Sequence, residues 1–239
     1  MKRNAVLAAS ALLAASLAMP ALAGDRALVD FIGFSGDGRY FAFEEFGVQD
    51  GSGFPFSTIY VIDLPADKWV SGSPFSARLE DDGALVDKVR QQSRALAVGV
   101  LEDLAVNETA DLIALNGDGE TGDGKTLSFG TPGYGLSGPQ NPQTLVLETF
   151  AADTPGTPCS DYTADPTLGF ALSLDGVELH RDTTLPKSRG CALDYRIYGV
   201  VEPAQLGGSG PGAVAIVSVY PFGFEGPDRR FIAVPFDQP

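Results

Sequence analysis

Residues 31–64 read FIGFSGDGRYFAFEEFGVQDGSGFPFSTIYVIDL, and they set the pattern for most of the chain. Three runs rich in aromatic and β-branched residues are separated by clusters of Gly, Asp and Ser. Such runs between turn residues predict β-strands joined by tight turns. Around this stretch we expect strands at residues 27–34, 39–48 and 58–64.

The same alternation of apolar runs and turns continues toward the C-terminus. Further strands are expected at residues 126–129, 144–150, 168–174, 195–202, 213–220 and 230–235. Residues 214–219 are apolar at nearly every position, as in a strand that is covered on both faces. We therefore predict a mainly β protein with antiparallel sheets, built as a two-sheet sandwich or as a partial, propeller-like architecture.

A helical insert is expected at about residues 82–115, within a single domain that spans residues 24–239. Leu85, Val89 and Leu96 recur at helical spacing, with acidic residues before them and basic residues among them, which suits the helix dipole. A second short helix is expected at residues 108–115, where Asn107 would cap its first turn.

Residues 1–23 have the features of a secretory signal peptide. Lys2 and Arg3 precede an apolar run over residues 5–19, and Ala21-Leu22-Ala23 offers a small-residue cleavage site after Ala23. The run falls short of the roughly 20 apolar residues that a spanning helix needs, and no Cys follows the cut to carry a lipid. We expect a periplasmic or secreted protein without stable membrane insertion.

The charge balance excludes one class of partner. The chain has 16 Lys and Arg against 31 Asp and Glu, which gives a formal net charge of −15. Nucleic acids and anionic lipids are bound by clustered cations, so no nucleic-acid partner is expected. Cationic partners and Ca²⁺ stay open, although acidity also serves plain solubility.

Cys159 and Cys191 are the two cysteines of the chain. In an oxidising compartment an even pair of cysteines predicts a disulfide bond. The alternative, a metal site or a catalytic thiol, finds little support because the chain has a single His and no further Cys.

The chain also resembles known families. GFSGDGRYFAFEEFG (residues 33–47) and STIYVIDL (residues 57–64) are similar to a blade motif of TolB-type and WD-like β-propellers. Over most of its length the chain resembles a family of predicted secreted bacterial proteins catalogued as a domain of unknown function. The segments that carry this resemblance are GDRALVDFIGFSGDGRYFAFEEFGVQDGSGFPFSTIYVIDLP, LIALNGDG, GFALSLDG, ELHRD, SRGC, DYRIYGV and VAIVSVYPFGFEGPDRRFIAVPF. It implies export and a shared fold, and it brings no activity or site residues with it.

Residues 119–126 read GETGDGKT and match the phosphate-binding loop pattern. That loop needs a helix after it, whereas the residues that follow here are strand-like and end at Pro132. The acidic residues of the loop would also repel a triphosphate. The loop is a better candidate for Ca²⁺, since it gathers four oxygen-bearing side chains, although it lacks the glycine and the closing Glu of the twelve-residue calcium loop. The four are Asn116, Asp118, Glu120 and Asp123; the alternative is a plain solvated loop.

Candidates for catalysis are few. His180 is the only His, no Gly-x-Ser-x-Gly elbow accompanies it, and we read it as a surface or hydrogen-bonded residue. Glu44 and Glu45 are adjacent on a predicted strand and so face opposite sides, and we expect one of them in apolar surroundings with a raised pKa. If the similar hairpins at residues 33–43 and 223–234 lie side by side, Glu225 and Asp228 would complete a carboxylate pair for glycoside chemistry.

Two simpler alternatives stand beside these candidates. The carboxylates would instead form salt bridges, for which we name Arg39, Arg229 and Arg230 as partners. The aromatic residues of the Gly- and Pro-rich turns would form an exposed patch for a partner protein or a glycan, or be buried to fasten loops to the core; we favour burial. These residues are Phe54, Phe56, Phe222 and Phe224.

We therefore predict an exported, non-catalytic binding or scaffolding protein of the cell envelope, with an envelope protein or a glycan as partner and no cofactor. A carboxylate-based hydrolase of envelope polysaccharide and a calcium-binding envelope protein are the alternatives. An enzyme would need two acids converging in a concave pocket, whereas a binding protein would need exposed aromatic residues.

Overall fold

The computed structural model describes residues 24–118, 122–131, 133, 138–156, 158–204 and 212–237. The expected signal peptide and its cleavage site lie outside the described residues, as does Glu120. Within the described part, no helix combines the length and the apolar character that crossing a membrane requires.

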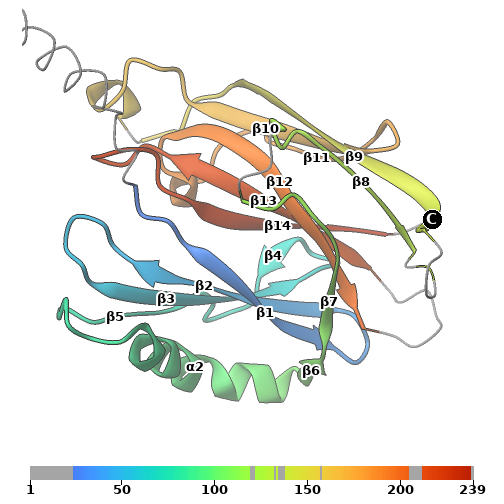
Figure 1. The fold of residues 1–239 in the computed structure, drawn as a ribbon, viewed down its shortest axis with the longest axis horizontal. Coiled ribbons are helices and arrows are strands. Elements are labelled where there is room, and N and C mark those ends of the chain that lie inside the picture. The colour runs from blue at the N-terminus through green and yellow to red at the C-terminus, as the bar shows by residue number, and fades with distance from the viewer. Residues whose placement is uncertain are drawn as a thin grey trace, which may run out of the picture.

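The described chain forms three antiparallel sheets and one α-helix (Figure 1). The first sheet has the order β4-β3-β2-β1-β6, with β5 paired to β3. Its strands are β1 (Leu28–Ser35), β2 (Tyr40–Val48), β3 (Pro55–Asp63), β4 (Lys68–Trp69), β5 (Phe75–Arg78) and β6 (Val106–Glu108). The helix α2 (Val86–Asp103) lies between β5 and β6 in the sequence.

The two other sheets have four strands each. The middle sheet has the order β14-β13-β12-β7 and consists of β7 (Ala110–Leu115), β12 (Ala192–Pro203), β13 (Ala213–Pro221) and β14 (Arg230–Phe236). The third sheet has the order β11-β10-β9-β8 and consists of β8 (Thr126–Thr131), β9 (Gln140–Ala151), β10 (Leu168–Leu174) and β11 (Val177–Arg181). Two short 3₁₀ helices, η1 (Cys159–Asp161) and η2 (Lys187–Arg189), lie in the loops.

The middle sheet packs between the other two, and this position explains the continuous apolar run of β13. Val214 and Ile216 belong to the core shared with the first sheet, whereas Ala215 and Val217 belong to the core shared with the third sheet. Successive side chains of a strand point to opposite faces, so a strand with two covered faces must be apolar at every position. The helix α2 covers the far face of the first sheet (Figure 1).

The turn between β1 and β2 shows how the polar clusters of the sequence shape the hairpins. The backbone N–H of Gly38 donates to the carbonyl of Ser35, and the Ser35 hydroxyl donates to the Asp37 carboxylate at 2.6 Å. Gly38 has φ +68°, a left-handed conformation that costs glycine little. The predicted hairpin is confirmed here.

The mainly β class with antiparallel sheets is confirmed, while the second predicted helix is wrong. Residues 106–115 form β6 and β7, which pair with β1 and β12 respectively. Pairing with β12 makes β7 a strand of the middle sheet and partly buries its apolar side chains against the two cores on either side, and these tertiary contacts outweigh the local helical pattern. The first predicted helix exists as α2 and begins about one turn later than expected.

The predicted disulfide joins Cys159 to Cys191, which are 32 positions apart in the sequence. It connects η1 to the residue that precedes β12. Both cysteines are buried.

Candidate functional site

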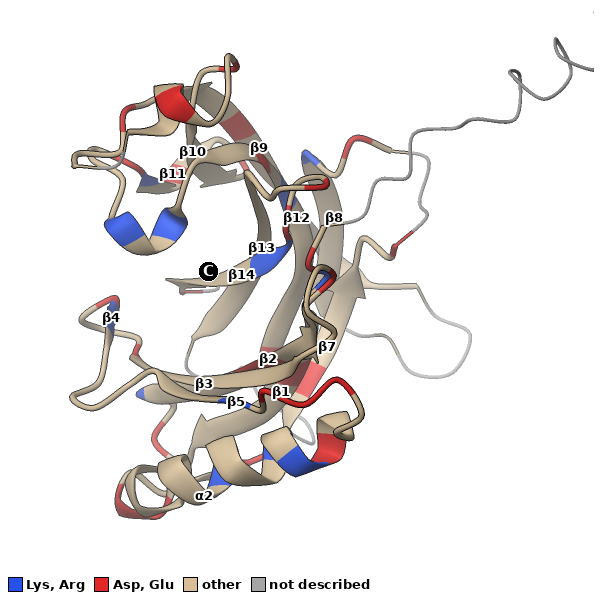
Figure 2. Ribbon diagram, turned by 90° about the vertical axis from the view of Figure 1, so that its left-hand side faces the viewer, with Lys and Arg blue, Asp and Glu red and all other residues tan. Residues whose placement is uncertain are grey.

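A cleft of about 560 Å³ opens where the three sheets end in edge strands. The edge strands are β4 of the first sheet, β14 of the middle sheet and β11 of the third, and Figure 2 shows them on the same side of the molecule. Residues 230–234 of β14, residues 67–69 around β4 and a segment from 180 to 189 line it. Ligand pockets of proteins fall in this range of volume.

One wall of the cleft is aromatic. Phe43 and Tyr60 face each other across β2 and β3 with ring centroids 4.9 Å apart, and the Trp69 ring lies 5.5 Å from that of Tyr60. The strand register places the three rings on one face of the first sheet, because Trp69 pairs with Ile62, two positions after Tyr60. Trp69 is the only Trp of the chain and is 47% exposed.

The opposite wall holds an ion-paired cluster around Asp182. The imidazole Nε2 of His180 donates to Asp182 Oδ1 at 3.1 Å, and the guanidinium of Arg189 lies 3.3 Å from the same oxygen. The backbone N–H of Phe170 donates to Asp182 Oδ2 at 3.0 Å. The predicted hydrogen-bonded role of His180 is therefore confirmed.

These contacts set the charge of Asp182 and the position of its neighbours. Burial alone raises the pKa of Asp182, but the hydrogen bond from His180, the charge of Arg189 and the Phe170 N–H together bring the pKa below its usual value. An ionised Asp182 holds the imidazole and the guanidinium in place along this wall, and the His180 ring stacks on Phe170 with centroids 4.7 Å apart.

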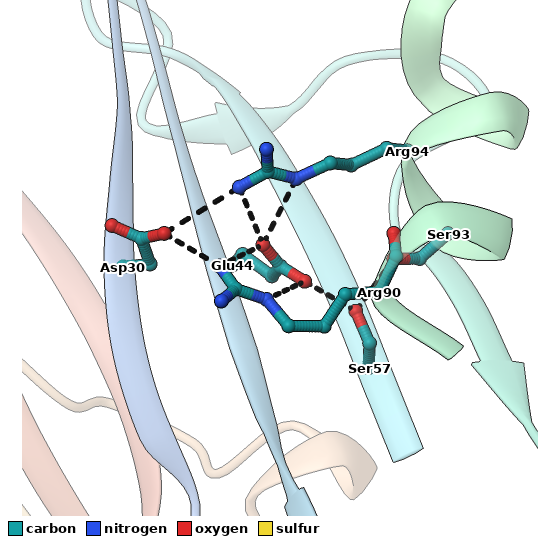
Figure 3. A network of polar contacts seen from close by, with 6 residues as sticks. All are labelled: Asp30, Glu44, Ser57, Arg90, Ser93 and Arg94. Atoms are coloured by element: carbon teal, nitrogen blue, oxygen red, sulfur yellow. Dashed lines mark hydrogen bonds and ion pairs between the residues drawn. The ribbon is translucent and has the colours of Figure 1, made fainter. Parts of the chain in front are cut away.

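Glu44 lies away from the cleft, between the first sheet and α2 (Figure 3). Arg90 binds its carboxylate with two nitrogens at 2.9 and 3.0 Å, Arg94 adds a contact at 3.1 Å, and the Ser57 hydroxyl donates at 2.8 Å. Burial raises the pKa of Glu44, but Arg90 and Ser57 more than offset this, so the pKa is lowered. The expected salt bridge exists, but its partners are Arg90 and Arg94 rather than those predicted.

Glu45 points to the other face of the sheet and is 1% exposed. One carboxylate oxygen accepts the backbone N–H of Phe231 on β14, and the other accepts the Tyr60 hydroxyl at 3.3 Å. Burial raises the pKa of Glu45 to about 7. The prediction that one of the two glutamates has a raised pKa is confirmed, and this carboxylate lies directly behind the aromatic wall.

Glu225 and Asp228 lie in the loop between β13 and β14. Asp228 accepts the backbone N–H of Asp25 at 2.8 Å and lies 3.8 Å from Arg230, one of the predicted ion-pair partners. A hydrogen bond with Asp50 raises the pKa of Glu225, and burial raises that of Asp228. Neither residue lines the cleft. The four carboxylate candidates therefore occupy three separate environments.

Three of the four calcium-loop candidates lie in the described part of the chain, and each contacts other protein groups. The Asn116 amide donates to the carbonyls of Thr126 and Ile197 at 3.2 and 3.1 Å, and Asp123 accepts the backbone N–H of Lys125 at 2.9 Å. Asp118 pairs with Arg26 and Arg229. Among the described residues, no group of three or more His, Cys, Asp or Glu could hold a metal ion. Calcium binding by this loop stays a prediction.

The turn aromatics differ in exposure. Phe54 and Phe56 are half-buried beneath the guanidinium groups of Arg78 and Arg230. Phe222 is 37% exposed and Phe224 is 97% exposed, so the expectation of burial is wrong for these two residues, whose loop lies outside the packed sheets.

A family model described as "Predicted secreted protein (DUF2259)" matches residues 42–236. The chain belongs to this family. The match runs from β2 to the end of β14 and includes the aromatic wall and the Asp182 cluster of this DUF2259 protein. The family description gives secretion and no activity. No curated protein and no solved structure matches the chain.

Sequence reasoning found His180 but missed Trp69, Lys68 and Arg189. β4 has two residues and η2 has three, so neither carries a periodic pattern. The one available signal was that Trp69, the single Trp, follows a short polar turn after an apolar strand.

Proposed function

We propose that this secreted DUF2259 protein is a non-catalytic binding protein of the cell envelope, and that it binds a glycan in the cleft between β4, β11 and β14. The observation that carries the proposal is the half-exposed Trp69, which lies beside the stacked rings of Phe43 and Tyr60 in a concave site. A flat aromatic ring offers apolar area to the C–H face of a sugar ring, and its rigidity keeps the entropic cost of binding low.

The rest of the lining suits the same ligand. Sugar hydroxyls need donors and acceptors close to the stacked ring, and Asp67, Thr183 and Ser188 line the cleft. The walls rest on packed sheets, so the site is largely formed before the ligand arrives.

The placement of the acids supports binding rather than hydrolysis. Glycosidases use two carboxyl groups on either side of the bond, roughly 5 to 10 Å apart. Two carboxylates line the cleft, Asp67 and Asp182, and Asp182 is fixed by Arg189 and His180. Glu44 lies between the first sheet and α2, and Glu45 is buried behind the aromatic wall, so neither lines the cleft.

Titration calorimetry with polysaccharide extracted from the envelope of the producing cells tests the proposal. The exported protein should bind, Trp69→Ala should weaken binding about tenfold or more, and Phe224→Ala should bind like the unmodified protein. Phe224 is the matched control because it is an exposed aromatic residue outside the cleft. Equal binding by Trp69→Ala, or no binding by any of the three proteins, would overturn the proposal.

A further inference from the structure

One buried carboxylate links two walls of the cleft. Glu45 of β2 accepts the backbone N–H of Phe231 on β14 with one oxygen and the Tyr60 hydroxyl of β3 with the other. Both partners line the cleft, whereas Glu45 itself does not. The carboxylate therefore joins the first sheet to the edge strand of the middle sheet, directly behind the surface that a ligand would touch.

The strands around Glu45 are mainly apolar. Val29 of β1 and Thr58 of β3 pair with Glu45, and neither carries a charge. From β12, Tyr198 adds a ring to the same core and packs against Phe231 with centroids 5.1 Å apart. An ionised carboxylate in such surroundings loses most of the hydration that it has in water.

Arg230 of β14 is the cation whose charge acts on Glu45, and this charge is shared. Its guanidinium also pairs with Asp25 at 3.3 Å and with Asp228 at 3.8 Å. Burial outweighs Arg230 and the hydrogen bonds from Phe231 and Tyr60, so the pKa of Glu45 is raised to about 7. The charge of Glu45 therefore changes near neutral pH.

Tyr60 connects Glu45 to the aromatic wall. The Tyr60 ring stacks on Phe43 with centroids 4.9 Å apart, and its centroid lies 5.5 Å from that of Trp69. When Glu45 is ionised, it can only accept hydrogen bonds, so the Tyr60 hydroxyl must donate to it. When Glu45 is protonated, its own O–H can donate to the Tyr60 oxygen, and no buried charge is left.

From these contacts we infer that Glu45 couples the cleft to pH, and that the cleft binds its ligand most tightly while Glu45 is protonated. Ionised Glu45 is stabilised by water, which the cleft beside Tyr60 and Phe231 can supply. A ligand that covers these two residues excludes that water and so disfavours the ionised form. The effect on affinity rests on the proposed function, whereas the coupling of Glu45 to Trp69 is a property of the ligand-free protein.

The direction of the pH effect follows from linkage. Because the ligand disfavours ionised Glu45, the pKa of Glu45 is higher in the complex than in the free protein. Affinity is therefore full below the pKa of the free protein, falls as the pH rises through about 7, and levels off above the pKa of the complex.

An NMR titration of the ligand-free protein between about pH 5.5 and 8.5 tests the coupling. The amide of Phe231 reports the ionisation of Glu45, to which it donates, and the indole N–H of Trp69, the single Trp, reports the cleft. Both signals should shift with one common midpoint near pH 7. This transition should be absent in Glu45→Gln, which is never ionised.

His180→Gln is the control, because His180 lies on the opposite wall and an imidazole also changes its charge near neutral pH. The common transition of Phe231 and Trp69 should persist in this variant. A Trp69 signal that shows no such transition, that keeps it in Glu45→Gln or that loses it in His180→Gln overturns the inference.

Titration calorimetry with the envelope polysaccharide measures the effect on affinity. The unmodified protein should bind about three- to tenfold more tightly at about pH 6 than at about pH 8.5, and Glu45→Gln should bind equally at both. Equal affinity of the unmodified protein at both pH values overturns the inference and leaves the proposed function intact. Absence of binding at either pH overturns the proposed function, and the NMR titration then decides on the coupling alone.

Discussion

Glu44 and Glu45 are neighbours on β2, yet their carboxylates lie in different cores on opposite faces of the first sheet. Glu44 is fixed by Arg90 of α2, and Glu45 accepts the backbone N–H of Phe231 on β14. On the face that α2 covers, Arg90 and Arg94 place positive charge beside Glu44. On the face toward the middle sheet, Glu45 is surrounded mainly by apolar side chains. The pKa is therefore lowered for Glu44 and raised for Glu45, which gives the two residues opposite effects on stability as pH changes.

Glu44→Gln should lower the free energy of unfolding by about 2 to 4 kcal/mol, because it leaves Arg90 partly buried without its main partner. Because the pKa of Glu44 is lowered, its stabilising effect is present above its unfolded pKa near 4.5 and fades as the pH falls through the folded value. Urea unfolding at pH 7 measures the effect.

Arg94→Ala is the control for the Glu44 network, since this side chain is half exposed and Arg90 stays in place. Arg94→Ala should lower the free energy of unfolding by no more than about 1 kcal/mol. If Glu44→Gln and Arg94→Ala lowered the free energy of unfolding by the same amount, the pairing of Glu44 with Arg90 would not be a main source of stability.

Glu45→Gln should stabilise the protein at alkaline pH. The pKa of Glu45 is raised from 4.5 to about 7, so stability is full below pH 4.5, falls as the pH rises toward 7 and then levels off. The glutamine is never ionised, and its side-chain oxygen can still accept the Phe231 N–H. Its advantage should be near zero at pH 4.5 and reach about 2 to 3 kcal/mol at pH 8.

Urea unfolding of both proteins across this pH range gives the difference curve for Glu45. A difference that does not change with pH would contradict a raised pKa at this position. Because only Glu45 differs between the two proteins, the titration of other groups cancels from the comparison.

Replacing both Cys159 and Cys191 by Ser should lower the free energy of unfolding by about 3 to 4 kcal/mol, as expected for a closed loop of some 33 residues. The unmodified protein in reducing agent should lose a similar amount. Thermal unfolding with and without reductant checks this, and a melting temperature that is independent of reductant would contradict it.

Features that depend on long, regular strands could be predicted from the sequence. The two-sided apolar run of β13 indicated a strand covered on both faces, and the alternation on β2 separated the faces of Glu44 and Glu45. Residues 108–115 were misread because an apolar run of that length suits a helix or a strand, and only pairing with β12 decides between them.

The cleft was not predictable in the same way. It is formed by the edges of three sheets, and its key groups come from a two-residue strand, a three-residue 3₁₀ helix and the end of β11. Such short elements have no periodicity, and their meeting depends on how whole sheets pack.

The proposed ligand occupies the cleft between Trp69 and His180. Both residues are unique in the chain and line opposite walls, so the indole N–H and the imidazole Cε1–H each give a single NMR signal in the untagged protein. Addition of the envelope polysaccharide is predicted to shift both signals with one common dissociation constant. Binding that leaves the two signals unmoved would contradict the account.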